Sequence, residues 1–186
     1  NGGWIAFEQT YGLPRIDLMT GVFSGYAWGA NVGWIGLSNV QAHVRTGALL
    51  PGAASDGDGM PDAWEYRWAG NLTRLSGGGH DEDGDGVPDA AEYPADTDPT
   101  SDADWFAVVS IEKGTATDRI GWTARPTRLY RIEATNVMPP GVAGAWQDIL
   151  GIEVGPMGAS PAYLQVPVSP ETTRFYRVQA LVPLGP

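Results

Sequence analysis

Short runs rich in apolar residues, interrupted by single polar ones, fill the C-terminal part of the chain, and such runs are typical of β-strands. Turns rich in glycine and proline separate the runs, which cover residues 105–111, 119–122, 129–133, 163–166 and 174–182. Regularly spaced short strands of this kind favour a β-sandwich. We therefore predict a β-sandwich domain over residues 105–186, with the aromatic core residues Trp122, Tyr130, Trp146, Phe175 and Tyr176.

The first fifty residues contain an internal repeat with aromatic residues at regular positions. The segment Asn1-Gly-Gly-Trp4-Ile5 returns as Asn31-Val-Gly-Trp34-Ile35. In the segment between the two copies, Tyr26 and Trp28 stand at alternating positions. Glycine and asparagine turns around this alternation predict β-hairpins, so we expect an aromatic β-repeat segment over residues 1–50. Units this short cannot bury an aromatic face alone, which favours a core position for these rings. The alternative is a sugar-stacking platform formed by Trp4, Tyr26, Trp28 and Trp34.

The repeat begins in the middle of a unit. A Gly-Tyr-Ala-Trp-Gly segment at 25–29 precedes the second copy and has no counterpart before Asn1. An unfinished unit exposes a strand edge, which a second copy of the chain would complete by strand addition. Head-to-tail contacts of this kind do not close and therefore produce filaments. We expect a homo-oligomer or polymer, as a subunit of an extracellular filament or surface layer.

Between these two β-rich regions lies an acidic block, residues 51–104, which we expect to be a separate domain. It carries fourteen aspartates and glutamates against Arg67 and Arg74, a net charge of −12, whereas the whole chain has a net charge of −11. The carboxylates are not spread evenly. They follow the spacing of two calcium loops, and such a run would repel itself unless a hard cation were bound within it.

The second loop, residues 81–92, is complete. Positions 1, 3, 5, 9 and 12 carry acids, position 6 is Gly86, which permits a sharp turn, and position 7 offers a backbone carbonyl. The predicted ligands are Asp81, Asp83, Asp85, the Val87 carbonyl, Asp89 (directly or through water) and Glu92. Six to eight oxygens at this spacing suit Ca²⁺, because Mg²⁺ resists such crowding and bidentate ligation.

The first loop lacks the acid at position 1, where Ala54 stands. Its predicted ligands at positions 3, 5, 7, 9 and 12 are Asp56, Asp58, the Met60 carbonyl, Asp62 and Glu65. Three later aspartates are candidates to reach back and complete this site: Asp96, Asp98 and Asp102. A surface Asp-Pro turn is the alternative for these three, and both interpretations stay open.

Each loop leads into a short helix. Pro61 and Pro88 occupy equivalent positions, and proline at a first helical turn loses no hydrogen bond, so we predict helices over about 61–69 and 88–93. Glycine-rich segments precede both loops, so we expect no helix before either loop. Each unit is therefore EF-hand-like only in its loop and the helix that follows. We expect Trp64, Trp68 and Tyr93 to form a small core between the two loop-helix units.

Three motifs of the acidic block are specific. They are Asp-Gly-Asp-Gly-Met-Pro-Asp-Ala-Trp-Glu at 56–65, Asp-Glu-Asp-Gly-Asp-Gly-Val-Pro-Asp-Ala-Ala-Glu at 81–92 and Thr-Asp-Pro-Thr at 97–100. The block resembles thrombospondin type 3 repeats and the related dockerin-type calcium loops. This resemblance implies structural calcium in an extracellular multidomain protein. Ala54 and the long connection 67–80 depart from the thrombospondin pattern.

The flanking segments carry further resemblances. Gly-Tyr-Ala-Trp-Gly-Ala-Asn-Val-Gly-Trp-Ile at 25–35 is similar to a repeat of secreted bacterial surface proteins. Tyr-Arg-Ile-Glu at 130–133, followed by Trp146 and Phe-Tyr-Arg-Val at 175–178, is similar to C-terminal β-domains of such proteins. Neither resemblance implies an activity for a particular residue.

Composition narrows the classes of function. The chain has no cysteine, which excludes disulfides, thiol chemistry and zinc sites of the cysteine type. It has no apolar run long enough to span a membrane, and its negative charge disfavours nucleic acid as a partner. The chain begins with Asn1, so we expect that an earlier segment was removed and that the protein is extracellular or at the cell surface.

Catalysis is not indicated. His43 and His80 are the histidines of the chain, they lie in different segments, and no catalytic motif accompanies them. We expect no enzyme activity, no catalytic residues and Ca²⁺ as the bound cofactor. The predicted fold is mainly β with a small α-containing calcium-loop module. The predicted function is that of a secreted, calcium-stabilised structural protein; the alternative is a carbohydrate- or cell-surface-binding accessory module of a larger secreted enzyme, with a surface glycan as partner.

Overall fold

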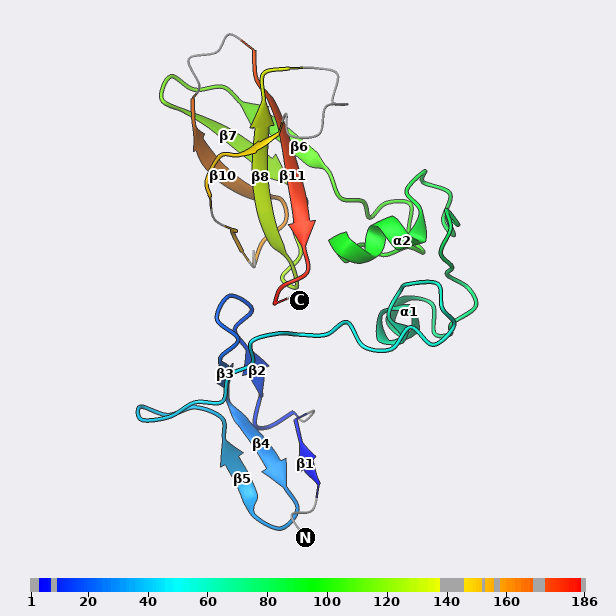
Figure 1. The fold of residues 1–186 in the computed structure, drawn as a ribbon, viewed down its shortest axis with the longest axis vertical. Coiled ribbons are helices and arrows are strands. Elements are labelled where there is room, and N and C mark those ends of the chain that lie inside the picture. The colour runs from blue at the N-terminus through cyan, green and yellow to red at the C-terminus, as the bar shows by residue number, and fades with distance from the viewer. Residues whose placement is uncertain are drawn as a thin grey trace. The chain divides into compact units, whose positions relative to one another are not determined.

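The computed structural model describes residues 4–7, 10–137, 146–151, 153–155, 158–168 and 173–184. Its described part is mainly β with short α-helices, as predicted from the sequence (Figure 1). The chain divides into two compact units, an N-terminal unit of Asn1–Leu50 with Pro183–Pro186 and a C-terminal unit of Pro51–Val182. The acidic block and the β-rich segment after it therefore belong to one unit.

The N-terminal unit is built from short antiparallel strands. One sheet has the order β1-β4-β5, with β1 Ile5–Ala6, β4 Tyr26–Gly29 and β5 Gly33–Gly36. A second pair joins β2 Arg15–Ile16 to β3 Phe23–Ser24. The two copies of the repeat lie on opposite sides of β4, since Ile5 is opposite Gly29 and Trp34 is opposite Trp28. The end of the chain joins the same unit, where the Leu49 amide donates to the Leu184 carbonyl at 2.7 Å.

The aromatic residues of this sheet lie on its surface. Because side chains alternate between faces, the pairs Tyr26–Gly36 and Trp28–Trp34 place their rings on one face. Tyr26 is 55% exposed, Trp28 43% and Trp34 49%, and Trp4 is also exposed. Among the described residues of this unit, the buried hydrophobic side chains are Ala27 and Leu37. The expectation that the rings form a core is therefore wrong, because nothing in the described part of the unit covers this face.

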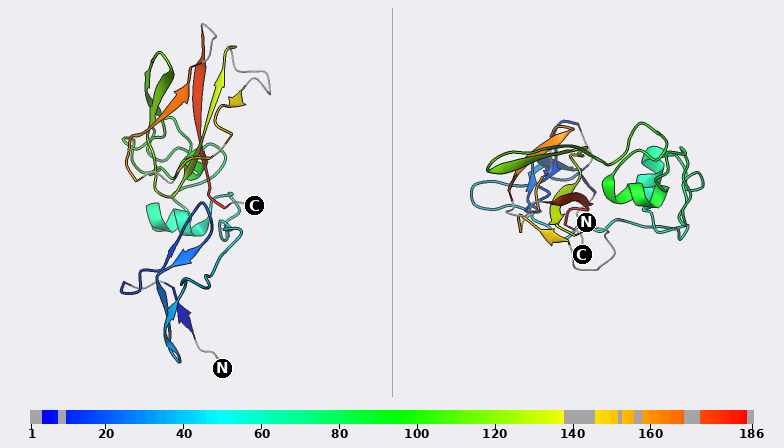
Figure 2. Two further views of the ribbon diagram at one scale, coloured as in Figure 1. Left: turned by 90° about the vertical axis from the view of Figure 1, so that its left-hand side faces the viewer. Right: turned by 90° about the horizontal axis from the view of Figure 1, so that it is seen from above.

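The β-rich part of the C-terminal unit contains two open antiparallel sheets within the described residues (Figures 1 and 2). One has the order β10-β7-β6, with β6 Val108–Glu112, β7 Thr117–Trp122 and β10 Ala162–Pro167. The other has the order β11-β8-β9, with β8 Leu129–Thr135, β9 Gln147–Asp148 and β11 Phe175–Leu181. All five predicted strands are present. The additional strand β9 pairs through two residues and has no sequence signal of its own.

The two sheets share one hydrophobic core. Ile120 and Trp122 of β7 pack with Tyr130 and Ile132 of β8, and Val166 of β10 completes the centre. Trp122 and Tyr130 are fully buried, with ring centroids 5.5 Å apart. Tyr176 is half-buried and packs against this cluster, whereas Trp146 and Phe175 are half-buried and lie outside it. The predicted aromatic core is thus confirmed in Trp122, Tyr130 and Tyr176.

The acidic block contains α1 Asp62–Trp68, α2 Asp89–Glu92 and the 3₁₀ helix η1 Tyr93–Ala95. Pro61 and Pro88 stand directly before the two α-helices. The described helices are too short to cross a membrane. A small cluster of Met60, Trp64 and Leu75 is buried, with Trp68 and Tyr93 packed against it. The predicted core of Trp64, Trp68 and Tyr93 is confirmed, and Met60 and Leu75 are members that the aromatic pattern did not reveal.

Candidate metal centre

The second acidic loop is held in shape by its own carboxylates. Asp81 accepts hydrogen bonds from the Gly84 amide (2.8 Å) and the Gly86 amide (3.0 Å). Asp83 accepts from the Asp85 amide at 3.0 Å, and Asp85 accepts from the Val87 amide at 2.6 Å. Each aspartate thereby fixes a turn two to five residues ahead of it, which is a local effect of aspartate side chains on the backbone. The three carboxylates consequently converge.

The convergence is tight enough for a metal ion. Asp81, Asp83 and Asp85 each bring one carboxylate oxygen within 4.8 Å of the others. In the first loop, Asp56, Asp62 and Glu65 do the same. Gly59 and Gly86, at position 6 of the two loops, both have φ of +95°, a conformation that favours glycine and that confirms the predicted sharp turn.

The carboxylates at position 12 carry the strongest sign of a cation. Glu65 is 0% exposed and Glu92 is 2% exposed, and their oxygens have no hydrogen-bond donor among the described residues. One oxygen each of Asp58 and Asp83 is buried in the same way. Burying an ionised carboxylate without a donor costs on the order of several kcal/mol. A bound metal ion is one group that would satisfy these oxygens.

The electrostatics of the two glutamates agree with that reading. Burial raises the pKa of Glu92 to about 7; the nearby Thr97 side chain lowers it, but the charges of Asp83, Asp85 and Asp89 raise it further. Burial likewise raises the pKa of Glu65 to about 7, together with the charges of Asp58, Asp56 and Asp62. Both loops therefore hold carboxylates whose negative charge the protein itself does not balance.

Asp89, at position 9 of the second loop, is bound by protein groups. The Asp89 carboxylate is buried and accepts from the Glu82 amide at 2.9 Å and the Ser76 amide at 3.0 Å, and it lies 2.7 Å from Nδ1 of His80. The hydrogen bond to Asp89 raises the pKa of His80. Asp89 thus ties the start of α2 to the start of the loop. Ser76 and His80 were not predicted as supporting residues, because nothing in the spacing of the acids indicates them.

The first loop keeps the same backbone with fewer carboxylates. Asp62 accepts from the Ser55 amide at 2.6 Å, as Asp89 does from Glu82, and Asp58 accepts from the Met60 amide at 2.8 Å, as Asp85 does from Val87. The Gly57 amide donates to the Ala54 carbonyl at 3.2 Å, where the equivalent Gly84 amide uses the Asp81 carboxylate. A backbone oxygen therefore replaces the missing side chain in the turn.

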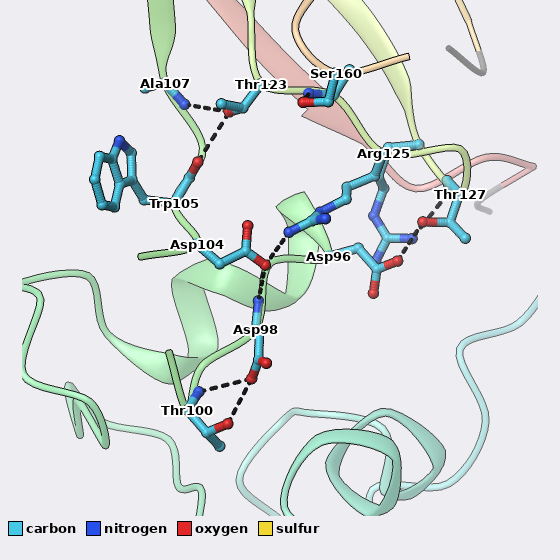
Figure 3. A network of polar contacts seen from close by, with 12 residues as sticks. Asp96, Asp98, Thr100, Asp104, Trp105, Ala107, Thr123, Arg125, Thr127 and Ser160 are labelled. Atoms are coloured by element: carbon cyan, nitrogen blue, oxygen red, sulfur yellow. Dashed lines mark hydrogen bonds and ion pairs between the residues drawn. The ribbon is translucent and has the colours of Figure 1, made fainter. Parts of the chain in front are cut away.

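Asp96 has other partners than the first loop. Its carboxylate is buried and accepts from Nε1 of Trp64 and Nη1 of Arg67, both at 3.2 Å. It also accepts from the Thr127 hydroxyl (Figure 3). Arg128 lies 3.9 Å away. These contacts join α1 to the β-rich part of the same unit, so Asp96 acts as an anchor between them.

Asp98 closes a local turn. It accepts from the amide and the hydroxyl of Thr100 at 3.0 and 2.7 Å, and its own amide donates to Asp104 at 3.0 Å. Asp104 also forms an ion pair with Arg125 (Figure 3). These contacts fit the Asp-Pro turn that the sequence left open for Asp98. Asp102 is exposed and lines an open pocket beside the second loop.

Comparison with known proteins adds no relative. No protein-family model matches this chain, and neither a curated protein nor a solved structure shows significant similarity to it.

Proposed function

We propose that each acidic loop binds one Ca²⁺ and that the protein is a calcium-stabilised structural protein that works outside the cell. The observation that carries this proposal is the pair Glu65 and Glu92, which are buried without hydrogen-bond donors beside converging aspartates. An uncompensated charge of this kind is strongly destabilising, and a bound cation removes the penalty in both loops.

The donor set favours calcium over other metals. The second loop offers carboxylates of Asp81, Asp83, Asp85 and Glu92 with the Val87 carbonyl, all hard oxygen ligands. Zinc and copper prefer nitrogen and sulfur ligands, whereas calcium accepts many oxygens and a bidentate glutamate. The resemblance of both loops to thrombospondin type 3 and dockerin-type loops supports the same ion.

Cation binding and folding of the acidic block are coupled in this proposal. The hydrophobic cluster of the block, Met60, Trp64 and Leu75, is small for a segment with a net charge of −12. Without the ions, repulsion among the carboxylates opposes the packing of this cluster. Calcium therefore makes the block a stiff structural element.

Ion counting tests the proposal. Protein passed through gel filtration in calcium buffer is analysed by elemental mass spectrometry, and a melting curve is recorded with calcium and with EDTA. We expect two bound calcium ions and a large loss of thermal stability in EDTA. A chain that retains no calcium, or that melts identically in both buffers, contradicts the proposal. Magnesium in place of calcium would keep the structural role and change the ion.

Assembly into filaments stays a prediction. The strands β1 and β5 lie at the edges of their sheet in the described part of the N-terminal unit, and an edge strand is where a second copy would pair. Electron microscopy of calcium-loaded protein at high concentration is the direct test. Monodisperse monomers under those conditions would contradict it.

Glycan binding is a second candidate, favoured by the exposed aromatic face of the N-terminal unit. Tyr11, Tyr26 and Trp34 line a shallow pocket of about 280 Å³ on this face. Flat exposed rings are the surface on which sugar rings stack. A glycan array compares the wild-type protein with Trp34→Ala, with Trp105→Ala of the other unit as a control of similar exposure. Binding that survives Trp34→Ala argues against this candidate.

A further inference from the structure

An open pocket of about 480 Å³ lies against the second acidic loop. Three stretches of the C-terminal unit line it: the loop residues Gly84, Asp85 and Val87, the turn residue Asp102, and the pair Trp105 and Phe106 that leads into β6. The walls are an aromatic pair, an aliphatic side chain and two carboxylates. Asp85 and the Val87 carbonyl are predicted ligands of the second loop and Asp102 was a candidate for the first, whereas Gly84, Trp105 and Phe106 belong to no predicted metal site.

The aromatic wall is rigid and accessible. Trp105 is 48% exposed, and its indole ring points away from the Asp104–Arg125 pair (Figure 3). Its backbone is fixed because the Thr123 hydroxyl donates to the Trp105 carbonyl at 3.0 Å, while the Ala107 amide donates to the same hydroxyl at 2.8 Å. Phe106 stacks on the buried Tyr130 with ring centroids 6.0 Å apart. The core of the β-rich part therefore holds this wall in place.

The charged side chains that line the pocket are Asp85 and Asp102; because Asp85 is a proposed calcium ligand, Asp102 supplies the free negative charge of the calcium-loaded pocket. Asp102 has neither a hydrogen bond nor an ion pair among the described residues, whereas its neighbours Asp98 and Asp104 both have donors. The surrounding block keeps a negative charge even with two divalent ions bound. An exposed indole face beside an unpaired carboxylate attracts a cation through the ring quadrupole and through charge.

The basic residues of the same unit are already engaged. In the described part of the C-terminal unit, every arginine and lysine has an acceptor of its own. The pairs are Arg67–Asp96, Arg74–Glu82, Lys113–Asp118, Arg119–Glu112, Arg125–Asp104, Arg131–Glu153 and Arg177–Glu133, and Arg128 and Arg174 donate to backbone carbonyls. A cation for the pocket must therefore come from outside this unit.

We propose that this pocket binds the side chain of an arginine or lysine presented by a basic peptide. The guanidinium or ammonium group lies over the Trp105 ring and pairs with Asp102, and the aliphatic stem packs against Val87 and Phe106. The inference rests on the proposed function in one respect, because the wall Gly84–Val87 belongs to the second calcium loop. Binding is therefore expected to require calcium.

The test uses the full chain loaded with calcium and a fluorescent peptide with three arginines separated by glycines. A matched peptide carries citrulline, which keeps the shape of arginine without its charge. Fluorescence anisotropy should give saturable binding of the arginine peptide and at least tenfold weaker binding of the citrulline peptide. Trp105→Ala and Asp102→Asn should each weaken binding by roughly 3- to 30-fold. Tyr66→Ala, which removes an exposed aromatic side chain of α1 outside the pocket, should leave it unchanged.

Several results would overturn the inference. Equal affinity for the two peptides would exclude charge recognition, and full binding by Trp105→Ala would place the peptide elsewhere on the acidic surface. Trp105-dependent binding of a neutral oligosaccharide in place of the peptide would replace the cationic ligand by a sugar. Circular dichroism and ion counting on each variant establish that the fold and the calcium sites are intact.

Ion counting also separates this inference from the proposed function. Bound calcium without peptide binding overturns the pocket inference and leaves the metal proposal standing. Trp105-dependent peptide binding by a chain that holds no calcium overturns the metal proposal and the calcium requirement of the pocket, while recognition of the cationic side chain stands. Failure of both measurements overturns both.

Discussion

Buried carboxylates occur in both the acidic block and the β-rich part, and the glutamates at position 12 of the acidic loops lack the donors that Asp118 of the β-rich part has. In the β-rich part, Asp118 is buried and accepts from Lys113 at 2.7 Å, from the Tyr176 hydroxyl at 2.6 Å and from the Gly114 amide at 3.3 Å. In the acidic block, Glu65 and Glu92 have no donor among the described residues. A carboxylate with its own donors is balanced by the protein, and one without them is the kind of group that a bound cation would neutralise.

The pKa values follow the same division. Burial by itself would raise the pKa of Asp118, but the hydrogen bonds from Lys113, Tyr176 and Gly114 outweigh it and hold the pKa below its usual value. Burial raises the pKa of Glu65 and of Glu92 to about 7. The pKa is therefore lowered at one buried carboxylate and raised at the other two. The difference lies in the hydrogen-bond donors that the tertiary structure supplies.

Among the four substitutions, Glu92→Gln should have the largest effect, and it tests directly whether Glu92 binds a cation. The substitution removes a bidentate ligand, so calcium affinity of the second loop should fall by at least about 100-fold. In EDTA the same variant should melt at a higher temperature than the wild-type protein, because a neutral amide replaces an uncompensated charge. Calorimetric titration and melting curves measure the two effects. Glu82→Gln, which removes a surface carboxylate of the same loop, is the matched control.

A Glu92→Gln variant that is destabilised in both buffers would show that Glu92 has a protein partner after all. A Glu92→Gln variant that binds calcium as tightly as the wild-type protein would show that Glu92 is not a ligand. Either result would end the distinction between the two regions.

Asp118→Asn should reduce the free energy of unfolding by about 1–3 kcal/mol, equally with calcium and with EDTA, because its partners are protein groups. The folded pKa of Asp118 lies below its unfolded value, so its stabilisation is present above about pH 4 and is lost as the pH falls through the folded pKa. Urea unfolding across the acidic pH range measures the difference from wild type. Glu153→Gln, a surface change in the same region, should stay close to wild type at every pH. A calcium-dependent effect of Asp118→Asn would contradict the assignment.

Ala54→Asp gives the first loop the position 1 aspartate that the second loop has in Asp81. The backbones of the two loops agree, as Asp62 donates its amide to the Ala53 carbonyl at 2.7 Å and Asp89 to the His80 carbonyl at 2.8 Å. The added carboxylate supplies the position 1 ligand and should raise the calcium affinity of the first loop by about tenfold. Ala54→Asn, which adds a neutral oxygen, should give a smaller gain. Indistinguishable affinities of the first loop in wild type and Ala54→Asp would show that a carboxylate at position 1 does not contact the ion there.

His80→Gln should have the smallest effect of the four. It removes the side-chain contact that helps to hold Asp89, which the Ser76 and Glu82 amides still bind. Calcium affinity of the second loop should fall by roughly 3- to 10-fold. Titration calorimetry on the variant measures it, and the first loop serves as the internal control. A loss as large as that of Glu92→Gln would mean that Asp89 is itself a ligand held by His80.

Several features of the fold were readable from the sequence because they depend on local chemistry. Short apolar runs over 129–133 and 174–182, bounded by glycine- and proline-rich turns, predicted β8 and β11. The convergence of Asp81, Asp83 and Asp85 follows from hydrogen bonds that reach no more than five residues along the chain. The same spacing that predicted a site also builds the turns that shape it.

The tertiary structure decided what periodicity leaves open, namely what covers a face and which distant group meets a carboxylate. Alternation placed Tyr26, Trp28 and Trp34 on one face, yet their exposure depends on whether another layer packs there. Asp96 lies in an aspartate-rich stretch, yet its partners Arg67 and Thr127 are 29 and 31 residues away. Donors that approach from so far along the chain leave no mark in the local pattern, because only the packed chain brings them together.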